Sequence, residues 1–69
     1  MSSPAGWSLE KNNKSMIEWE NNTGDALVIL RKQSRGNWHL FLPNGRSVPG
    51  LTKREGKSRA VSWMRQNKY

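Results

Sequence analysis

The chain has 69 residues, no cysteine and one histidine, and its formal net charge at pH 7 is +7. This length supports one domain, and the lack of cysteine excludes disulfide frameworks, thiolate metal sites and cysteine nucleophiles. A lone histidine, His39, also excludes a structural zinc site built on histidine. We therefore expect no metal and no other cofactor, and a location in the reducing, intracellular space of the cytoplasm.

The charge is divided unevenly along the chain. Residues 1–30 carry two basic against four acidic side chains, a net of −2, whereas residues 31–69 carry ten basic side chains against Glu55 alone, a net of +9. A compact fold of such a chain presents positive potential over one side, which attracts polyanions. The longest apolar run, 26–30, is far shorter than the roughly 20 residues that cross a bilayer, so no membrane partner is expected.

The chain begins with an expected flexible tail, residues 1–6, followed by one basic domain over residues 7–69. The tail consists of small residues and lacks the charged and apolar parts of a signal peptide. A short alternating segment starts at Trp7, and a polar turn is expected at 11–14. Residues 16–20 alternate between apolar and acidic side chains, which is the pattern of a half-buried strand.

Two further strands are expected at 26–32 and 37–42. Alternation in the first places one set of side chains on one face, Leu27, Ile29 and Arg31, and a second set on the other, Ala26, Val28, Leu30 and Lys32. In the second strand, the side chains that alternate with His39 and Phe41 are Trp38, Leu40 and Leu42. Because Trp38 and Phe41 point to opposite faces, one of them lies away from the helix.

A hairpin is expected after the strand at 37–42. Asn44-Gly45 is typical of a type I′ turn, in which both central residues have positive φ. Residues 46–48 form the returning strand. Pro49-Gly50 is expected to end this strand, since proline suits only an edge position.

The C-terminal segment changes to a helical period. Thr52 and Glu55 have capping-box spacing, although Gly56 leaves open a helix start only at Lys57 or Ser58. The expected apolar side of the helix consists of Ala60, Val61, Trp63 and Met64. The prediction is an α+β fold, a three- to four-stranded antiparallel meander with one C-terminal helix packed on one face.

The sequence holds none of the common catalytic motifs, neither a glycine-rich phosphate loop nor a nucleophile elbow nor a metal-binding helix motif. Glu18 and Glu20 are interpreted as a solvated strand face. His39 opposite one of these glutamates is the one candidate proton shuttle. We therefore expect no catalytic residue and a protein that is not an enzyme.

A sheet covered by a helix on one face leaves its other face free, and such a sheet can enter the DNA major groove. The candidate groove-binding residues are Arg31, Lys32, Arg35, Asn37, His39 and Arg46. Four residues of the following loop and helix suit phosphate contacts, namely Lys53, Arg54, Lys57 and Arg59. The alternative for the whole set is charge that only keeps the domain in solution.

Two families are similar to parts of the chain. Residues 36–63 contain a strand with Trp38, then Pro-Asn-Gly-Arg (43–46), Thr-Lys-Arg-Glu (52–55), Ala60 and Trp63, and they resemble the small N-terminal DNA-binding domain of tyrosine recombinases of phages and transposons. In that family a three-stranded sheet lies in the major groove. The resemblance implies structural roles for Trp38, Pro43, Asn44, Gly45 and Trp63 and groove contacts for Arg31, His39 and Arg46. Here residues 56–59 separate Glu55 from Ala60, which departs from the family pattern.

A second set of residues, Trp19-Glu-Asn21, Thr23-Gly24, Trp38 and Ala60, is similar to small uncharacterised archaeal proteins with a meander and a final helix, which implies a fold but no activity.

These features together predict a nucleic-acid-binding module that prefers DNA to RNA and binds duplex DNA through a basic sheet face and the adjacent loop. One alternative is an RNA or single-strand binder in which Phe41 or a tryptophan stacks on bases. This alternative requires an uncovered ring, whereas we expect Trp7 or Leu9 to fold back over Phe41. Another alternative is a protein-interaction module whose sheet edge pairs with a partner or with a second copy of the chain.

Overall fold

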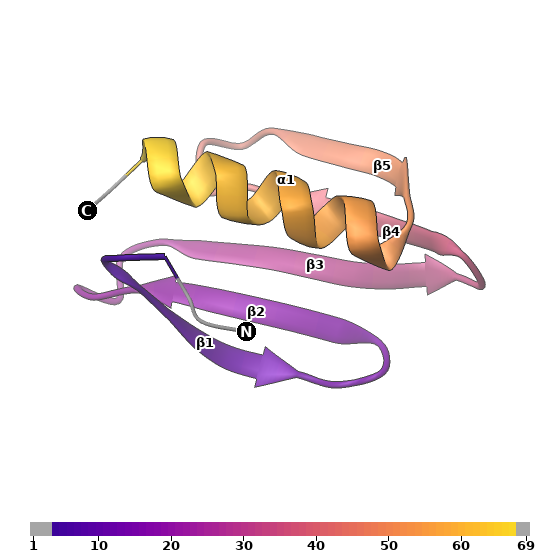
Figure 1. Cartoon of the computed structure of the whole chain (residues 1–69), viewed down its shortest axis with the longest axis horizontal. Coiled ribbons are helices and arrows are strands. Elements are labelled where there is room, and N and C mark those ends of the chain that lie inside the picture. Colours follow the sequence, from indigo (N-terminus) through magenta and orange to yellow (C-terminus); the bar gives the residue numbers. More distant parts are fainter. Residues whose placement is uncertain (1–3, 68–69) are drawn as a thin grey trace.

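The computed structural model describes residues 4–67, which form one five-stranded sheet and one helix (Figure 1). The elements are β1 (Trp7–Asn12), β2 (Met16–Asn21), β3 (Leu27–Ser34), β4 (Asn37–Phe41), β5 (Ser47–Leu51) and α1 (Lys53–Gln66). The sheet is an antiparallel meander in the order β1-β2-β3-β4-β5, and α1 crosses one of its faces. The predicted α+β meander with a C-terminal helix is confirmed, but the sheet has five strands instead of three to four.

The strand count differs because β1 and β5 run further than their polar and turn-forming residues indicate. β1 continues to Asn12 past a register shift between Leu9 and Lys11. The turn that follows is short, because the Asn13 side chain accepts hydrogen bonds from the backbone amides of Ser15 and Met16. β5 continues through Pro49 and Gly50 to Leu51, since an edge strand tolerates a proline.

The hairpin between β4 and β5 lies where Asn44-Gly45 predicts it, but its turn is not of type I′. Gly45 has φ +87°, whereas Asn44 is not among the residues with positive φ. The Gly45 amide donates to the Leu42 carbonyl over 3.2 Å, and the Asn44 side chain accepts from the Arg46 amide over 2.9 Å. Pro43 is thus the second residue of a turn that begins at Leu42, a position that favours proline. Gly45 adopts the left-handed conformation in a hairpin loop that is longer than two residues.

The expected tail falls only partly within the described residues, because residues 1–3 lie outside them. Residues 4–6 form a turn in which the Trp7 amide donates to the Pro4 carbonyl over 3.1 Å. The Gly6 carbonyl accepts from the Asn22 amide over 3.0 Å, so this turn lies against the connection between β2 and β3.

The core lies between α1 and the side chains of one sheet face. That face carries the residues assigned to it by alternation, including Val28, Leu30, Trp38 and Leu40, all buried. Their helical partners are Gly56, Ala60 and Met64. Trp7 extends this core to β1, because its ring meets the edge of Trp63 with centroids 6.0 Å apart.

The helix starts at Lys53, so Gly56 lies inside its first two turns. The predicted capping box is present, with the Glu55 amide donating to Thr52 Oγ1 and the Thr52 amide donating to Glu55 Oε1, each over 3.1 Å. A Cβ on Gly56 would lie 2.8 Å from Leu30 Cδ2, so glycine at this position permits the close approach of α1 to β3.

Candidate nucleic-acid interface

The ten residues predicted to form the interface are divided among several surfaces. Arg31 and His39 lie directly opposite each other on β3 and β4, on the sheet face that α1 leaves open. Lys32 lies opposite Trp38 and therefore belongs to the face that carries the helix. The predicted basic sheet face is thus reduced to Arg31 and His39 on its central strands.

The remaining strand and turn candidates lie at opposite ends of the sheet. Arg35 occupies the turn between β3 and β4, and Asn37 begins β4 opposite Ser34. Arg46 lies in the turn between β4 and β5, which Figure 1 places at the other end of the sheet. Arg31 and Arg46 are therefore not on neighbouring strands. Arg59 borders a small apolar notch between α1 and the β4–β5 hairpin.

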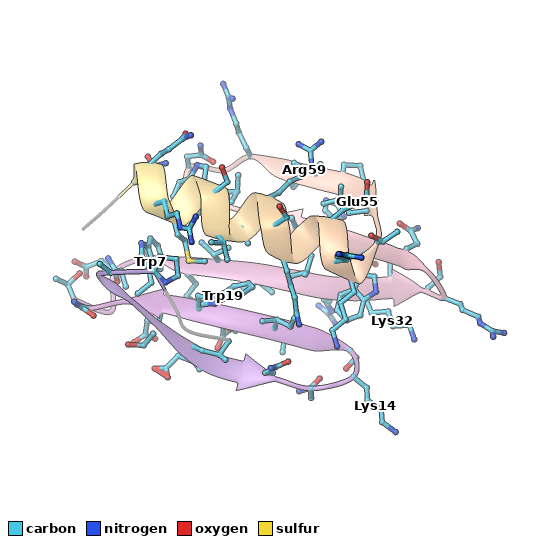
Figure 2. All side chains as sticks on the ribbon, viewed as in Figure 1. Trp7, Lys14, Trp19, Lys32, Glu55 and Arg59 are labelled. Atoms are coloured by element: carbon cyan, nitrogen blue, oxygen red, sulfur yellow. The ribbon has the colours of Figure 1, made fainter. Side chains whose placement is uncertain are left out.

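One end of the sheet gathers basic side chains from three segments that are distant in sequence. The turn between β1 and β2, the turn between β3 and β4 and the start of α1 all lie there (Figure 1). We call this surface the basic end, and its residues are Lys14, Lys32, Arg35, Lys53, Arg54 and Lys57. Figure 2 shows Lys14 and Lys32 at this end, with Lys32 near the start of the helix and Lys14 projecting from the β1–β2 turn.

Specific contacts fix the three segments of the basic end to one another. The Lys32 amide donates to the Ser15 carbonyl over 2.8 Å, which joins β3 to the β1–β2 turn. The Lys53 Nζ lies 5.7 Å from the centre of the Trp38 ring, within cation–π range, which joins α1 to β4. These two contacts connect neighbouring segments that carry the cations.

The acidic side chain at the start of α1, Glu55, has its carboxylate directed into the capping box. Its pKa lies below the usual glutamate range, because the Thr52 backbone amide and then the Thr52 side chain stabilise the carboxylate, with Arg59 adding a smaller effect. Glu55 is therefore ionised at neutral pH, and its Oε1 accepts the Thr52 amide at the helix end.

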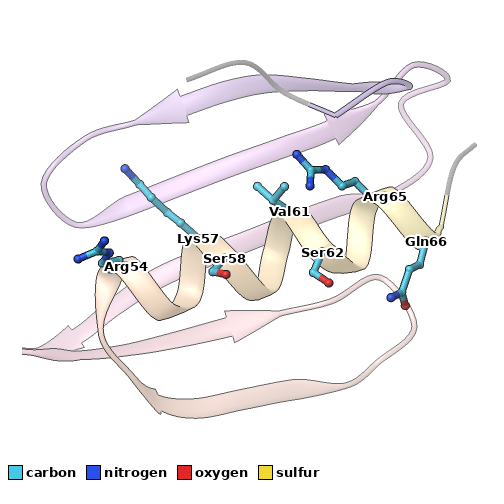
Figure 3. A pocket seen from close by; sticks show the side chains of 7 residues that line it. All are labelled: Arg54, Lys57, Ser58, Val61, Ser62, Arg65 and Gln66. Atoms are coloured by element: carbon cyan, nitrogen blue, oxygen red, sulfur yellow. The ribbon is translucent and has the colours of Figure 1, made fainter.

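A shallow groove of about 770 Å³ runs along α1 away from the basic end (Figure 3). Its lining repeats at helical spacing and contains three cations, two hydroxyls and an amide: Arg54, Lys57, Ser58, Val61, Ser62, Arg65 and Gln66. Figure 3 shows Lys57, Val61 and Arg65 pointing toward the side of β1 and β2. Lysine, arginine, serine and glutamine are the side chains that commonly contact phosphates.

No family model, curated protein or solved structure matches this chain. The resemblances to recombinase DNA-binding domains and to the archaeal meander proteins stay predictions. The function is therefore inferred from the chemistry of the surfaces themselves.

The open sheet face carries an aromatic pair on β4, in which Phe41 is exposed and His39 is half-buried with its Nε2 enclosed. The rings of His39 and Phe41 are stacked, with centroids 4.3 Å apart and planes 18° from parallel. Phe41 is 37% exposed. The expectation that Trp7 or Leu9 covers Phe41 is wrong, because Leu9 lies opposite the buried Trp19 and Trp7 packs on Trp63, so both lie on the helix side.

The open face also carries acidic residues, and they do not lie opposite His39. Glu18 pairs with Ile29 and Glu20 with Leu27, whereas the partner of His39 is Arg31. The candidate proton shuttle between His39 and a glutamate is therefore not assembled.

Within residues 4–67 no group of three or more histidine and carboxylate side chains has the spacing of a metal site. The helix in this range is not long and apolar enough to cross a membrane.

Both edges of the sheet carry features that hinder pairing with another strand. β5 contains Pro49, which lacks an amide hydrogen, and β1 has an irregular register beside Glu10. Pairing through a sheet edge, with a partner or with a second copy, stays a prediction that these features disfavour.

Proposed function

We propose that this protein is a non-enzymatic nucleic-acid-binding module whose basic end contacts the phosphates of its ligand. The proposal rests on one observation, the convergence of two hairpin turns and a helix start that each contribute cations to the same end. Such a surface attracts phosphates through charge that does not depend on base sequence. Cytoplasmic location, which places the protein among nucleic acids, remains part of the proposal.

Groove binding by the flat sheet is disfavoured by its width. Five strands spaced about 4.8 Å apart make a sheet roughly 19 Å across, whereas the major groove is about 12 Å wide. Glu18 and Glu20 on β2 would also be brought toward the phosphates. Duplex DNA would then be held by phosphate contacts at the basic end and not by base contacts along the sheet.

The proposal is tested by titrating labelled single-stranded DNA, duplex DNA and RNA with the protein over a series of salt concentrations. If about four to six cations contact phosphates, log K should fall against log salt with a slope of roughly −4 to −5 for duplex and about −3 to −4 for single strands. An affinity that does not change with salt contradicts the electrostatic contact.

A pair of matched double variants locates the surface. Arg35→Gln with Arg54→Gln removes two cations of the basic end, and Arg46→Gln with Arg59→Gln removes two arginines outside it. The first variant should bind more weakly, with a slope that is shallower by about 1.4 to 1.8. The second should keep the parental slope. Equal losses in the two variants would show that only the total charge matters.

A further inference from the structure

We propose that the open face of β3 and β4 is a stacking platform for unpaired bases, so that the ligand is a single-stranded nucleic acid. This inference rests on the proposed function, because the basic end would hold the phosphates while the platform holds the bases. It assigns a role to the His39–Phe41 pair, which contributes nothing to the core between the sheet and α1.

The first observation is an exposed aromatic ring, Phe41, which stacks on the half-buried His39. Phe41 exposes 37% of its surface on a strand whose neighbouring core residues, Trp38 and Leu40, are almost fully buried. The parallel arrangement of the His39 and Phe41 rings already has the geometry in which a base adds to a stack. A stacked base would remove apolar ring surface from water.

The second observation is the set of side chains around the pair. Ile29 lies opposite Phe41, Arg31 lies opposite His39, and Met16 lies on the other side of Arg31. Leu27, on the same face of β3, is 39% exposed. A π surface with apolar neighbours and one planar cation is the composition that binds unpaired bases with little sequence preference.

The third observation is the distribution of basic and acidic side chains around the platform. β3 continues from Arg31 to the turn that carries Arg35, so the platform adjoins this part of the basic end, whereas Lys32 points to the opposite face. Glu18 and Glu20 of β2 border the opposite side and repel phosphates. This pattern would keep a nucleic-acid backbone over β3 and β4.

The test compares Phe41→Leu with the parent protein for binding to labelled oligothymidine, at one salt concentration and then over a salt series. Leucine keeps an apolar side chain but removes the ring. We expect binding about 5- to 150-fold weaker, the equivalent of one lost base stack. The salt slope should stay unchanged, because no phosphate contact is removed.

Two control variants separate ring stacking from general apolar contact. Phe41→Tyr keeps the ring and should bind oligothymidine within about twofold of the parent. Leu27→Ala removes an exposed apolar neighbour on the same face, and its loss of affinity should be smaller than that of Phe41→Leu, because no ring is removed. Circular dichroism and thermal melting confirm that each variant is folded.

The outcomes separate this inference from the proposed function. If Phe41→Leu binds as tightly as the parent while the double variant of Arg35 and Arg54 binds weakly, the platform is wrong and the basic end stands. A duplex that binds more tightly than the single strand also overturns the platform. If neither variant changes binding, both proposals fail.

An RNA strand of matching length, tested beside the DNA, shows which of the two sugars the protein prefers. The same dependence of binding on Phe41 is expected with either strand.

Discussion

Gly56 of α1 and Leu30 of β3 lie so close that a methyl group on the glycine would overlap both methyl groups of the leucine. The glycine therefore permits the close approach of the helix to the sheet at this point. This close approach explains why a glycine stands inside a helix, where it is unfavourable by about 1 kcal/mol relative to alanine.

Gly56→Ala should therefore destabilise the protein, although alanine is the better helix former. Leu30 is fully buried, and overpacking of this kind costs roughly 1–3 kcal/mol. We expect the free energy of unfolding in urea to fall by up to about 2 kcal/mol after the gain in helix propensity. Ser58→Ala, on the exposed side of α1, is the control and should be neutral or slightly stabilising. An alanine at position 56 that stabilises the fold would show that Leu30 can move aside.

Trp38→Ala should unfold the domain or bring it close to unfolding. The ring is 5% exposed beneath α1, and loss of a large core aromatic costs about 3–5 kcal/mol, which is comparable to the whole stability of a domain this small. Phe41→Ala, on the opposite face of the same strand, should lower the melting temperature much less. Similar melting temperatures for the two variants would contradict the placement of Trp38 in the core.

The Glu55 carboxylate should make stability depend on acidity. The pKa of Glu55 is lower in the folded protein than in the unfolded chain, because the Thr52 amide stabilises the charged form. The stabilisation is therefore complete above the unfolded pKa and is lost as the pH falls through the folded pKa. The difference in melting temperature between the parent and Glu55→Gln should be constant near neutral pH and shrink below the usual glutamate range. A difference that does not change with pH would exclude this linkage.

Thr52→Ala tests the other half of the capping box. Removal of the hydroxyl leaves the Glu55 amide without its acceptor, and loss of such a cap costs about 1 kcal/mol. Thr52→Ser keeps the hydroxyl and should retain most of the stability. Urea unfolding at neutral pH measures both variants, and an alanine variant as stable as the parent would mean that water replaces the cap.

Arg65→Gln tests whether the nucleic acid continues along the groove of α1. Arg65 lies near the far end of that groove from the basic end. If the backbone follows the groove, the salt slope for single strands should become shallower by about 0.7. Arg46→Gln, outside the groove, should leave the slope unchanged. Equal slopes for all three proteins would confine the phosphates to the basic end.

The faces of the strands could be predicted from the sequence because alternation has a period of two and the core residues are large. Trp38 and Phe41 were therefore assigned correctly to opposite faces. The number of strands could not be predicted, since Lys11 and Asn12 are polar and Pro49 commonly ends a strand, whereas the pairing of the whole sheet decides both cases.

The basic end could not be predicted from the sequence either, because its position depends on the number of strands. Turns of an antiparallel meander alternate between its two ends, so the turns after β1 and β3 and the helix start after β5 share one end only when every strand is counted. Lys14 lies in the turn between β1 and β2, so its place at one end of the sheet follows only if β1 is recognised as a strand. Lys32 was predicted to share a surface with Arg31, although the two are neighbours in a strand and point to opposite faces.

The contact between Trp7 and the end of the helix lies at the end of the molecule that is opposite the basic end. The Trp7 Nε1 donates to the Asn67 carbonyl over 3.3 Å, so the first strand and the last turn of α1 meet far from the basic end. A fluorophore or a surface-immobilisation tag attached at either side of this junction would project away from the basic end. The domain can therefore be anchored to a sensor surface with its basic end facing the solution.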